Sequence, residues 1–263
     1  MLNEQRIDGE DSYVKTFFLV LVMGLLVFVA TGECAQKEGS VEFEGAQRTF
    51  FKTGKAEAVM SLEPLSGRKS LFAIGPVDGL DGEITIFDSK PYITKVRGSD
   101  YTLDQTFNHS AAFLVWTEQP LWQDIPIPAS VKDYAGLQQF IKTKAAEAGI
   151  DVNIPFAFLI SGIADMIKWH INTDRTDGKP ITKELFAKSK ESYITKNEPV
   201  DIIGFYSESH HGQFISEYAP AIKPESEAKN AIHIHLVSRV SKASGHIDDL
   251  TLGKDMILRL PKQ

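Results

Sequence analysis

The sequence predicts an α+β fold that is predominantly β. Three observations support this prediction. Apolar and polar residues alternate in several short runs at the two-residue period of a half-buried strand, Asp-Gly and Gly-Pro pairs separate these runs, and one segment stands out by its helical periodicity. With 263 residues, 43% hydrophobic and 24% charged, the chain can bury one substantial core or two that pack closely.

Charge and cysteine content narrow the classes of partner and site. The net charge is −7 and Lys and Arg are scattered, so nothing favours nucleic acid or an acidic membrane surface as a partner. One cysteine excludes an intrachain disulfide framework and a multi-cysteine zinc or iron–sulfur site. Any metal ion must therefore be held by imidazole and carboxylate groups.

Residues 1–34 predict a signal peptide or lipoprotein leader. Phe17 to Ala30 is a run of fourteen residues without a charge, too short for a comfortable transmembrane span but typical of a secretory signal. Cys34 lies where a lipoprotein carries its lipidated cysteine, although Glu33 does not fit that pattern. We expect export to the periplasm or the extracellular space, with or without a lipid anchor at Cys34. A buried N-terminal helix is the alternative.

The rest of the chain, residues 35–263, divides into two β-rich halves of about 45–150 and 151–263. The first half follows a polar linker and begins with a β-meander. A helix ends this half, with Ser130 as the expected N-cap and Gly149 as the end. The regular segments expected here are strands at 71–76, 83–87, 92–97 and 110–118 and the helix at 130–149.

The second half is predicted to contain further strands around few helices. Its apolar runs are short, and no fixed repeat links them. A polar stretch at 186–197 predicts a short helix or a loop. The strands expected in this half are 154–160 with 163–171 as its partner, 202–206, 231–238 and 256–261.

The most informative stretch is the strand at 231–238, which places His233 and His235 on one face. With His246, three of the seven histidines fall within fourteen residues. Three protein ligands with an open position are typical of a catalytic zinc site. The alternative is a set of partly buried rings, each hydrogen-bonded to a neighbour. A tight hairpin at 241–245 would place His246 nearer Arg239 than His235, so we expect a bend or a wider loop.

These motifs together resemble the α-acetolactate decarboxylase family, from about residue 45 to the C-terminus. His233-x-His235 with His246 matches the zinc ligands of that family. Leu80-Asp81-Gly82-Glu83 matches a stretch whose glutamate lies at the active site, and Pro155-Phe156-Ala157-Phe158 with Ser161-Gly162 matches the start of the second half. The resemblance implies two interlocked mixed β-sheet halves with few helices and Zn²⁺ in a cleft of the second half.

The chain departs from the family pattern at two places. The family has an arginine eight residues after the glycine of the third motif, where this chain has His170. The family also has a glutamate in a C-terminal tail that folds over the metal, whereas no glutamate follows Asp255 here. The chain is therefore identified as a divergent member.

The resemblance implies a zinc-dependent decarboxylase, a carbon–carbon lyase of acetoin biosynthesis. It would convert 2-acetolactate, or a related 2-hydroxy-3-oxo acid, to acetoin or the matching ketol plus CO₂. His233, His235 and His246 would hold Zn²⁺, Glu83 would act as acid/base or orient the substrate, and His170 would stand in for the arginine. Further candidates are Asp248 and Asp249 as hydrogen-bond partners of the ligating rings, and Glu208 and His210 as replacements for the tail glutamate.

Two alternatives remain open from the sequence. One is an exported metal- or ligand-binding protein of the same fold without decarboxylase activity, and the other is a different metal-dependent isomerase or hydrolase. The expected partner is a small 2-hydroxy-3-oxo acid, with membrane contact only through an N-terminal anchor and with a homodimer left open. Histidine ligands suit zinc, nickel, copper and iron alike.

Overall fold

The computed structural model describes residues 39–216, 219–222 and 229–262. The predicted leader, residues 1–34 with Cys34, lies outside the described residues. None of the helices in the described part of the chain has both the length and the apolar character needed to cross a membrane. The described residues belong to one compact unit.

The first of two six-stranded sheets is antiparallel, with the strand order β1-β8-β3-β4-β5-β6. It contains the predicted meander. Two short strands, β2 (Met60–Ser61) and β7 (Ser110–Ala111), pair with each other in a separate two-stranded sheet. The six strands are β1 (Glu42–Gly45), β3 (Leu71–Pro76), β4 (Glu83–Phe87), β5 (Lys90–Arg97), β6 (Asp100–Asp104) and β8 (Phe113–Glu118).

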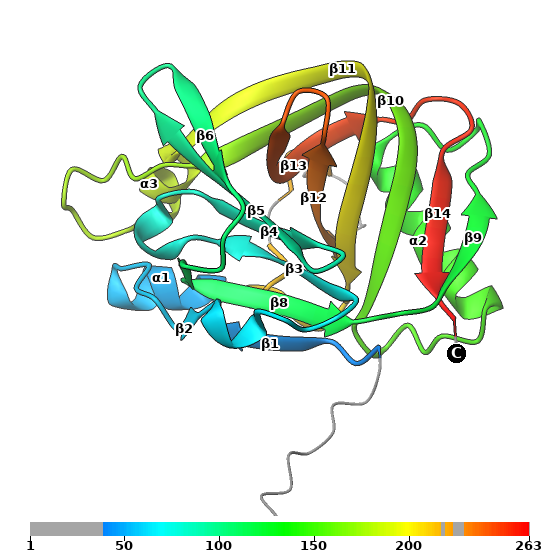
Figure 1. Cartoon of the computed structure of the whole chain (residues 1–263), viewed down its shortest axis with the longest axis horizontal. Coiled ribbons are helices and arrows are strands. Elements are labelled where there is room, and N and C mark those ends of the chain that lie inside the picture. The colour runs from blue at the N-terminus through cyan, green and yellow to red at the C-terminus, as the bar shows by residue number, and fades with distance from the viewer. Residues whose placement is uncertain (1–38, 217–218, 223–228, 263) are drawn as a thin grey trace, which may run out of the picture. The chain divides into compact units, whose positions relative to one another are not determined.

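The second sheet has the order β11-β12-β13-β10-β14-β9, and β10 also pairs with β11. Strands β10, β11, β12 and β13 therefore close into a ring. Figure 1 shows the long, curved β10 and β11 side by side, with the β12–β13 hairpin beneath their arch. The strands are β9 (Trp122–Pro126), β10 (Phe156–Asn172), β11 (Lys190–Tyr206), β12 (Ile232–Ser238), β13 (Ala243–Thr251) and β14 (Ile257–Pro261).

The described helices are short and few, which confirms the predicted α+β, predominantly β class. They are α1 (Gln47–Thr53), α2 (Tyr134–Glu147) and α3 (Lys183–Lys188), with single 3₁₀ turns at Glu63–Leu65 and Asp78–Leu80. The predicted helix at 130–149 is confirmed as α2, but its N-cap is Asp133 rather than Ser130. The Asp133 carboxylate accepts a hydrogen bond from the backbone N–H of Gly136 at 2.8 Å, which satisfies a free N–H of the first turn.

The predicted hairpin of 154–160 with 163–171 is wrong, because both segments belong to the single strand β10. Ser161-Gly162 is a bend within that strand, where Gly162 has φ +142° and a Cβ atom would lie 2.8 Å from Met256. The stretch 186–197 is also not one helix or loop, since most of it forms the start of β11. Its polar character reflects outward-facing residues, such as the exposed Ser192 and Lys196, rather than irregular structure.

Strand β9 and helix α2 precede the expected boundary near residue 150, yet both pack with the second sheet. Strand β9 pairs with β14, and the buried face of α2 lies in the same core as Ile232, Ile234 and Leu236 of β12. The opposite face of β12 points toward the first sheet, and Val237 on that face shares a core with Phe113 of β8. The histidines of β12 therefore lie between the two sheets.

Candidate metal centre and active-site cavity

The β12–β13 hairpin brings His246 directly opposite His235. Ser238 pairs with Ala243, so the hairpin turn occupies residues 239–242 rather than 241–245. The expected bend or wider loop is therefore not needed. The tight turn at residues 239–242 gives the register in which His246 lies opposite His235.

His170 joins the same face from a third strand. It pairs with His246 across β10 and β13, and side chains directly opposite in an antiparallel pair share a face. The ring centroids of His170 and His246 lie 4.8 Å apart, and those of His233 and His246 lie 4.9 Å apart. Four histidines from β10, β12 and β13 thus form one continuous imidazole surface.

Three of these rings fit a metal ion. One ring nitrogen from each of His233, His235 and His246 lies within 4.8 Å of the other two, and the Nε2 atoms of His233 and His235 are 3.2 Å apart. Nitrogens bound tetrahedrally at about 2.0–2.1 Å from a zinc ion would lie roughly 3.3 Å apart, which matches that pair. Burial lowers the pKa of His233 to about 3 and the pKa values of His235 and His246 well below the usual value. Neutral imidazole is the form that binds metal.

The orientation of His235 is set by the first sheet. Thr85 Oγ1 on β4 is hydrogen-bonded to His235 Nδ1 at 2.9 Å, and the Ser244 hydroxyl donates to the same Thr85 oxygen at 2.9 Å. When Nδ1–H donates to Thr85, Nε2 keeps its lone pair for a metal ion. Sequence reasoning missed Thr85, because a threonine on an alternating strand carries no local signal of this role.

Glu83 is not an exposed strand-end carboxylate, since it is only 2% exposed. Its two carboxylate oxygens lie 3.7 Å from Nε2 of His235 and 3.9 Å from Nε2 of His170. Burial raises the pKa of Glu83 well above its usual value, against the opposing effect of hydrogen bonds from the backbone and side chain of Asn172. A buried carboxyl with a raised pKa can carry a proton at neutral pH and donate it.

Asp248 follows His246 by two residues on β13 and lies at a β-bulge. Lys168 pairs with Asp249 and Trp169 with Ile247, so Asp248 has no partner in the β10–β13 register. His170 Nδ1–H donates to Asp248 Oδ2 at 2.9 Å. Asp248 was predicted as a hydrogen-bond partner of the metal-ligating rings. In the structure it accepts a hydrogen bond from His170 instead.

Lys190 completes this group from the start of β11. Its Nζ donates to Asp248 Oδ1 at 3.2 Å. Burial by itself raises the pKa of Asp248, but the hydrogen bond from His170 and the positive charge of Lys190 hold this pKa well below the usual range. Burial also lowers the pKa of His170. Lys190 was missed in the sequence because its segment was interpreted as a helix or loop.

The imidazole surface forms one end of a cavity of about 500 Å³. Cavities of this size are typical of small-molecule sites. His235 itself is fully buried behind the cavity wall. The polar lining residues are Gln47, Glu83, His170, Asn172, Lys183, Glu184, Lys190, Gln213, Ser216, His233, His246 and Asp248.

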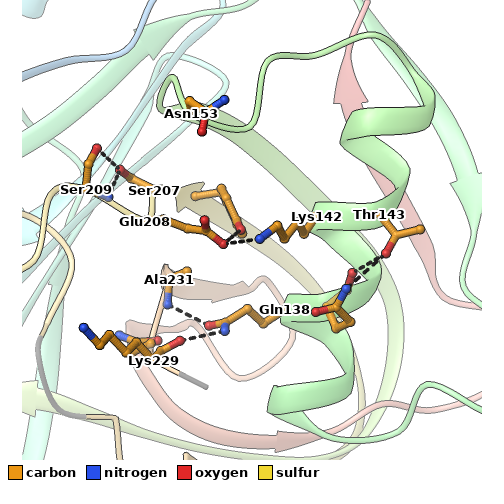
Figure 2. A network of polar contacts seen from close by, with 12 residues as sticks. Gln138, Lys142, Thr143, Asn153, Ser207, Glu208, Ser209, Lys229 and Ala231 are labelled. Carbon is orange, nitrogen blue, oxygen red and sulfur yellow. Dashed lines mark hydrogen bonds and ion pairs between the residues drawn. The ribbon is translucent and has the colours of Figure 1, made fainter. Parts of the chain in front are cut away.

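Glu208 and His210 do not line this cavity. Glu208 accepts hydrogen bonds from Lys142 Nζ at 2.6 Å and from the Tyr206 hydroxyl at 2.7 Å, and Figure 2 shows it facing Lys142 of α2. His210 Nδ1 is hydrogen-bonded to Ser207 Oγ at 2.7 Å. The structure therefore gives no support to either residue as a substitute for the tail glutamate.

Helix α2 also fixes the segment that leads into β12. The backbone N–H of Ala231 donates to Gln138 Oε1 at 2.7 Å, and Gln138 Nε2 donates to the carbonyl of Lys229 at 2.9 Å, as Figure 2 shows. The hydroxyl of Tyr134 donates to the carbonyl of Ile232 at 3.0 Å. These contacts hold the backbone just before His233.

Comparison with known proteins assigns a family to this architecture. The sequence profile of the alpha-acetolactate decarboxylase family matches residues 53–260. A solved alpha-acetolactate decarboxylase from Bacillus subtilis strain 168 has a TM-score of 0.61 at 16% identity, over 85% of this chain and 86% of that chain. A protein of unknown function similar to alpha-acetolactate decarboxylase, from Staphylococcus aureus, has a TM-score of 0.63 at 16% identity, over 84% of each chain. Direct comparison with curated proteins gives no match. Since the family profile covers most of its length, the chain belongs to the alpha-acetolactate decarboxylase family.

Proposed function

We propose that this chain is a zinc-dependent decarboxylase that converts 2-acetolactate, or a related 2-hydroxy-3-oxo acid, to acetoin or the matching ketol and CO₂. Family membership supports the reaction class. The observation that carries the proposal is the placement of the buried His233 and His235 and the partly buried His246, with one ring nitrogen of each within 4.8 Å of the others, beside a buried carboxyl group.

Loss of CO₂ leaves an electron pair that must move into the neighbouring ketone as an enediolate. When bound by His233, His235 and His246, Zn²⁺ supplies a Lewis acid for the charge on the hydroxyl and ketone oxygens. Glu83 is the proton donor in this proposal. Burial favours the protonated form of this carboxyl group, and in the proposal its proton is transferred to the carbon that lost CO₂.

Lys190 is proposed to hold the acidic end of the substrate, while His170 stands at the position of the family arginine and presents its Nε2 lone pair as an acceptor. A neutral imidazole lacks the fixed charge and the paired donors of an arginine. Lys190 supplies a positive charge one hydrogen-bonded step away, through Asp248. Asp248 fixes the His170 ring by accepting its Nδ1–H, so that Nε2 faces Glu83.

The direct test is to load the purified protein with zinc and supply 2-acetolactate. We expect acetoin and CO₂ in equal amounts. Folded protein that contains zinc and releases neither product would refute the decarboxylase.

A binding protein without turnover is the second candidate, and His170 at the position of the family arginine is the observation that favours it. In that case the zinc-loaded protein would bind a 2-hydroxy acid without consuming it. Activity that appears only in the His170→Arg variant would support this candidate and would explain why the parent is inactive.

Export remains a further proposal, based on the uncharged run of residues 17–30. Fractionation of cells that make the full chain tests it. Recovery of the whole protein inside the cell, with its N-terminal residues intact, would exclude it.

A further inference from the structure

Besides its polar residues, the cavity beside the imidazole surface is lined by four phenylalanines. Phe51 of α1, Phe113 of β8 and Phe186 of α3 line it together with Phe214, which follows β11. We call these four residues the aromatic wall. The proposed mechanism uses only polar residues of the cavity lining. It gives the aromatic wall no role.

The aromatic wall is built from segments that lie far apart in the sequence and contact one another. The rings of Phe51 and Phe186 meet edge to face with centroids 5.7 Å apart. Phe113 lies 6.0 Å from the His233 ring, which joins the wall to the metal centre. The backbone N–H of Ile181 donates to the carbonyl of Gly54 at 2.8 Å, which ties the segment before α3 to the end of α1. The wall is therefore a preformed surface.

We infer that the preferred substrate carries a bulky apolar substituent, such as a phenyl ring or an alkyl chain of several carbons, in place of a methyl group of acetolactate. This inference rests on the proposed function. Cavities of roughly 300–1,000 Å³ enclose drug-sized ligands. The oxygens of acetolactate can contact the polar lining residues, but its two methyl groups are too small to cover the aromatic wall. A cavity of about 500 Å³ has room for a larger group against the wall.

The physical reason is burial of apolar surface. Covering the aromatic wall with an apolar group removes apolar surface from water and lowers the free energy of the complex. Each buried methylene group raises affinity by about three- to fourfold. The polar head of the substrate makes the same contacts whatever its substituent. Selectivity for the larger acid therefore depends on the wall alone.

Binding of unreactive acids tests the inference without relying on catalysis. The probes are 2-hydroxy-2-methylpropanoate and 2-hydroxy-2-phenylpropanoate, which lack the ketone and cannot lose CO₂ by this route. With full-length, zinc-loaded protein, titration calorimetry should give at least about tenfold tighter binding of the phenyl acid and a more negative heat-capacity change. The Phe186→Ala variant should lose most of this preference, whereas Phe140→Ala, on α2 and outside the cavity lining, should keep it.

Equal affinity for the two acids would overturn the inference. So would a preference that neither Phe186→Ala nor Phe51→Ala reduces in variants with a wild-type circular dichroism spectrum. Turnover then separates this inference from the proposed function. If acetolactate is decarboxylated and the 2-phenyl analogue is not preferred in kcat/KM, only the inference fails. If neither acid is decarboxylated but the phenyl acid binds more tightly, the proposed function fails and the apolar subsite stands.

Discussion

The two faces of β12 are buried to a similar extent for opposite reasons. Ile232, Ile234 and Leu236 are no more than 1% exposed and pack in the apolar core with α2, where burial itself stabilises the fold. His233 and His235 are also buried, yet burying a polar ring costs free energy unless its nitrogens have partners. Burial of the apolar face stabilises the strand and offsets the free-energy cost of burying the histidine rings on the other face.

The largest effect is expected when the histidine face loses its central ring. The His235→Ala variant should fall from about one bound zinc per chain to nearly none, since loss of a ligand exceeds the roughly 10–100-fold cost of changes around a ligand. The metal-free variant should unfold at a lower urea concentration than metal-free wild type, because truncating a fully buried ring leaves a cavity and leaves Thr85 without this partner. Elemental analysis and urea titration measure the two quantities. His109→Ala is the control, because His109 contacts Asp104 instead; one tightly bound zinc in His235→Ala would contradict the proposed centre.

The next effect concerns the carboxyl group that faces the histidines. Glu83→Gln keeps the shape of the side chain but removes the transferable proton, so kcat should fall by about 10²–10⁴-fold with zinc retained. Steady-state kinetics with acetolactate, beside metal analysis, measures this. The exposed Glu44→Gln change on β1 should leave kcat unchanged. A loss of zinc equal to the loss of activity would indicate a structural role for Glu83 instead.

The apolar face should respond in stability and not in metal binding. Ile234→Ala is expected to reduce the free energy of unfolding by about 2–5 kcal/mol, because the variant loses buried surface and leaves a cavity beside α2. Urea unfolding of the metal-free protein measures this, with Val240→Ala in the exposed hairpin turn as the control. The comparison between the faces would break down if Ile234→Ala lost zinc while remaining stable.

The smallest effect is expected in the contacts around the ligands. Thr85→Val removes the hydroxyl that orients His235 without changing side-chain volume much, and zinc affinity should fall by roughly 10–100-fold. Competition with a chromophoric chelator gives the affinity. Thr94→Val is a matched control, since buried Thr94 donates to the Ser244 carbonyl and contacts no histidine. Equal affinities in the two variants would show that Thr85 does not orient the ring.

The histidine face could be predicted from the sequence because strand alternation is a local property. Two residues at positions i and i+2 share a face whatever the rest of the fold does. The position of His246 could not be predicted in the same way, since it depends on whether the turn begins at 239 or 241. A shift of register changes which residues lie opposite each other, and the packing of the surrounding sheet selects the register.

The residues around the three histidines were harder still to identify without the fold. Glu83 and His170 were found only through motif resemblance, and their burial was not evident from composition. Asn172 and Lys190 were missed because the polar start of β11 looks like a loop when the strands that pair with it are unknown. Asp248 was a candidate from its place two residues after His246, but its contact with His170 depends on the pairing of β10 with β13, which the sequence does not show.

The sequence alone determined the class of fold, the amphipathic histidine strand and the restriction of any metal site to imidazole and carboxylate ligands. These follow from local periodicity and from residue content. Only the tertiary structure decided that His170, Glu83 and Asp248 meet the histidine trio and that an aromatic wall faces them. The physical reason is that pairing between strands far apart in the chain is selected by burial of whole faces, which no short stretch of sequence encodes.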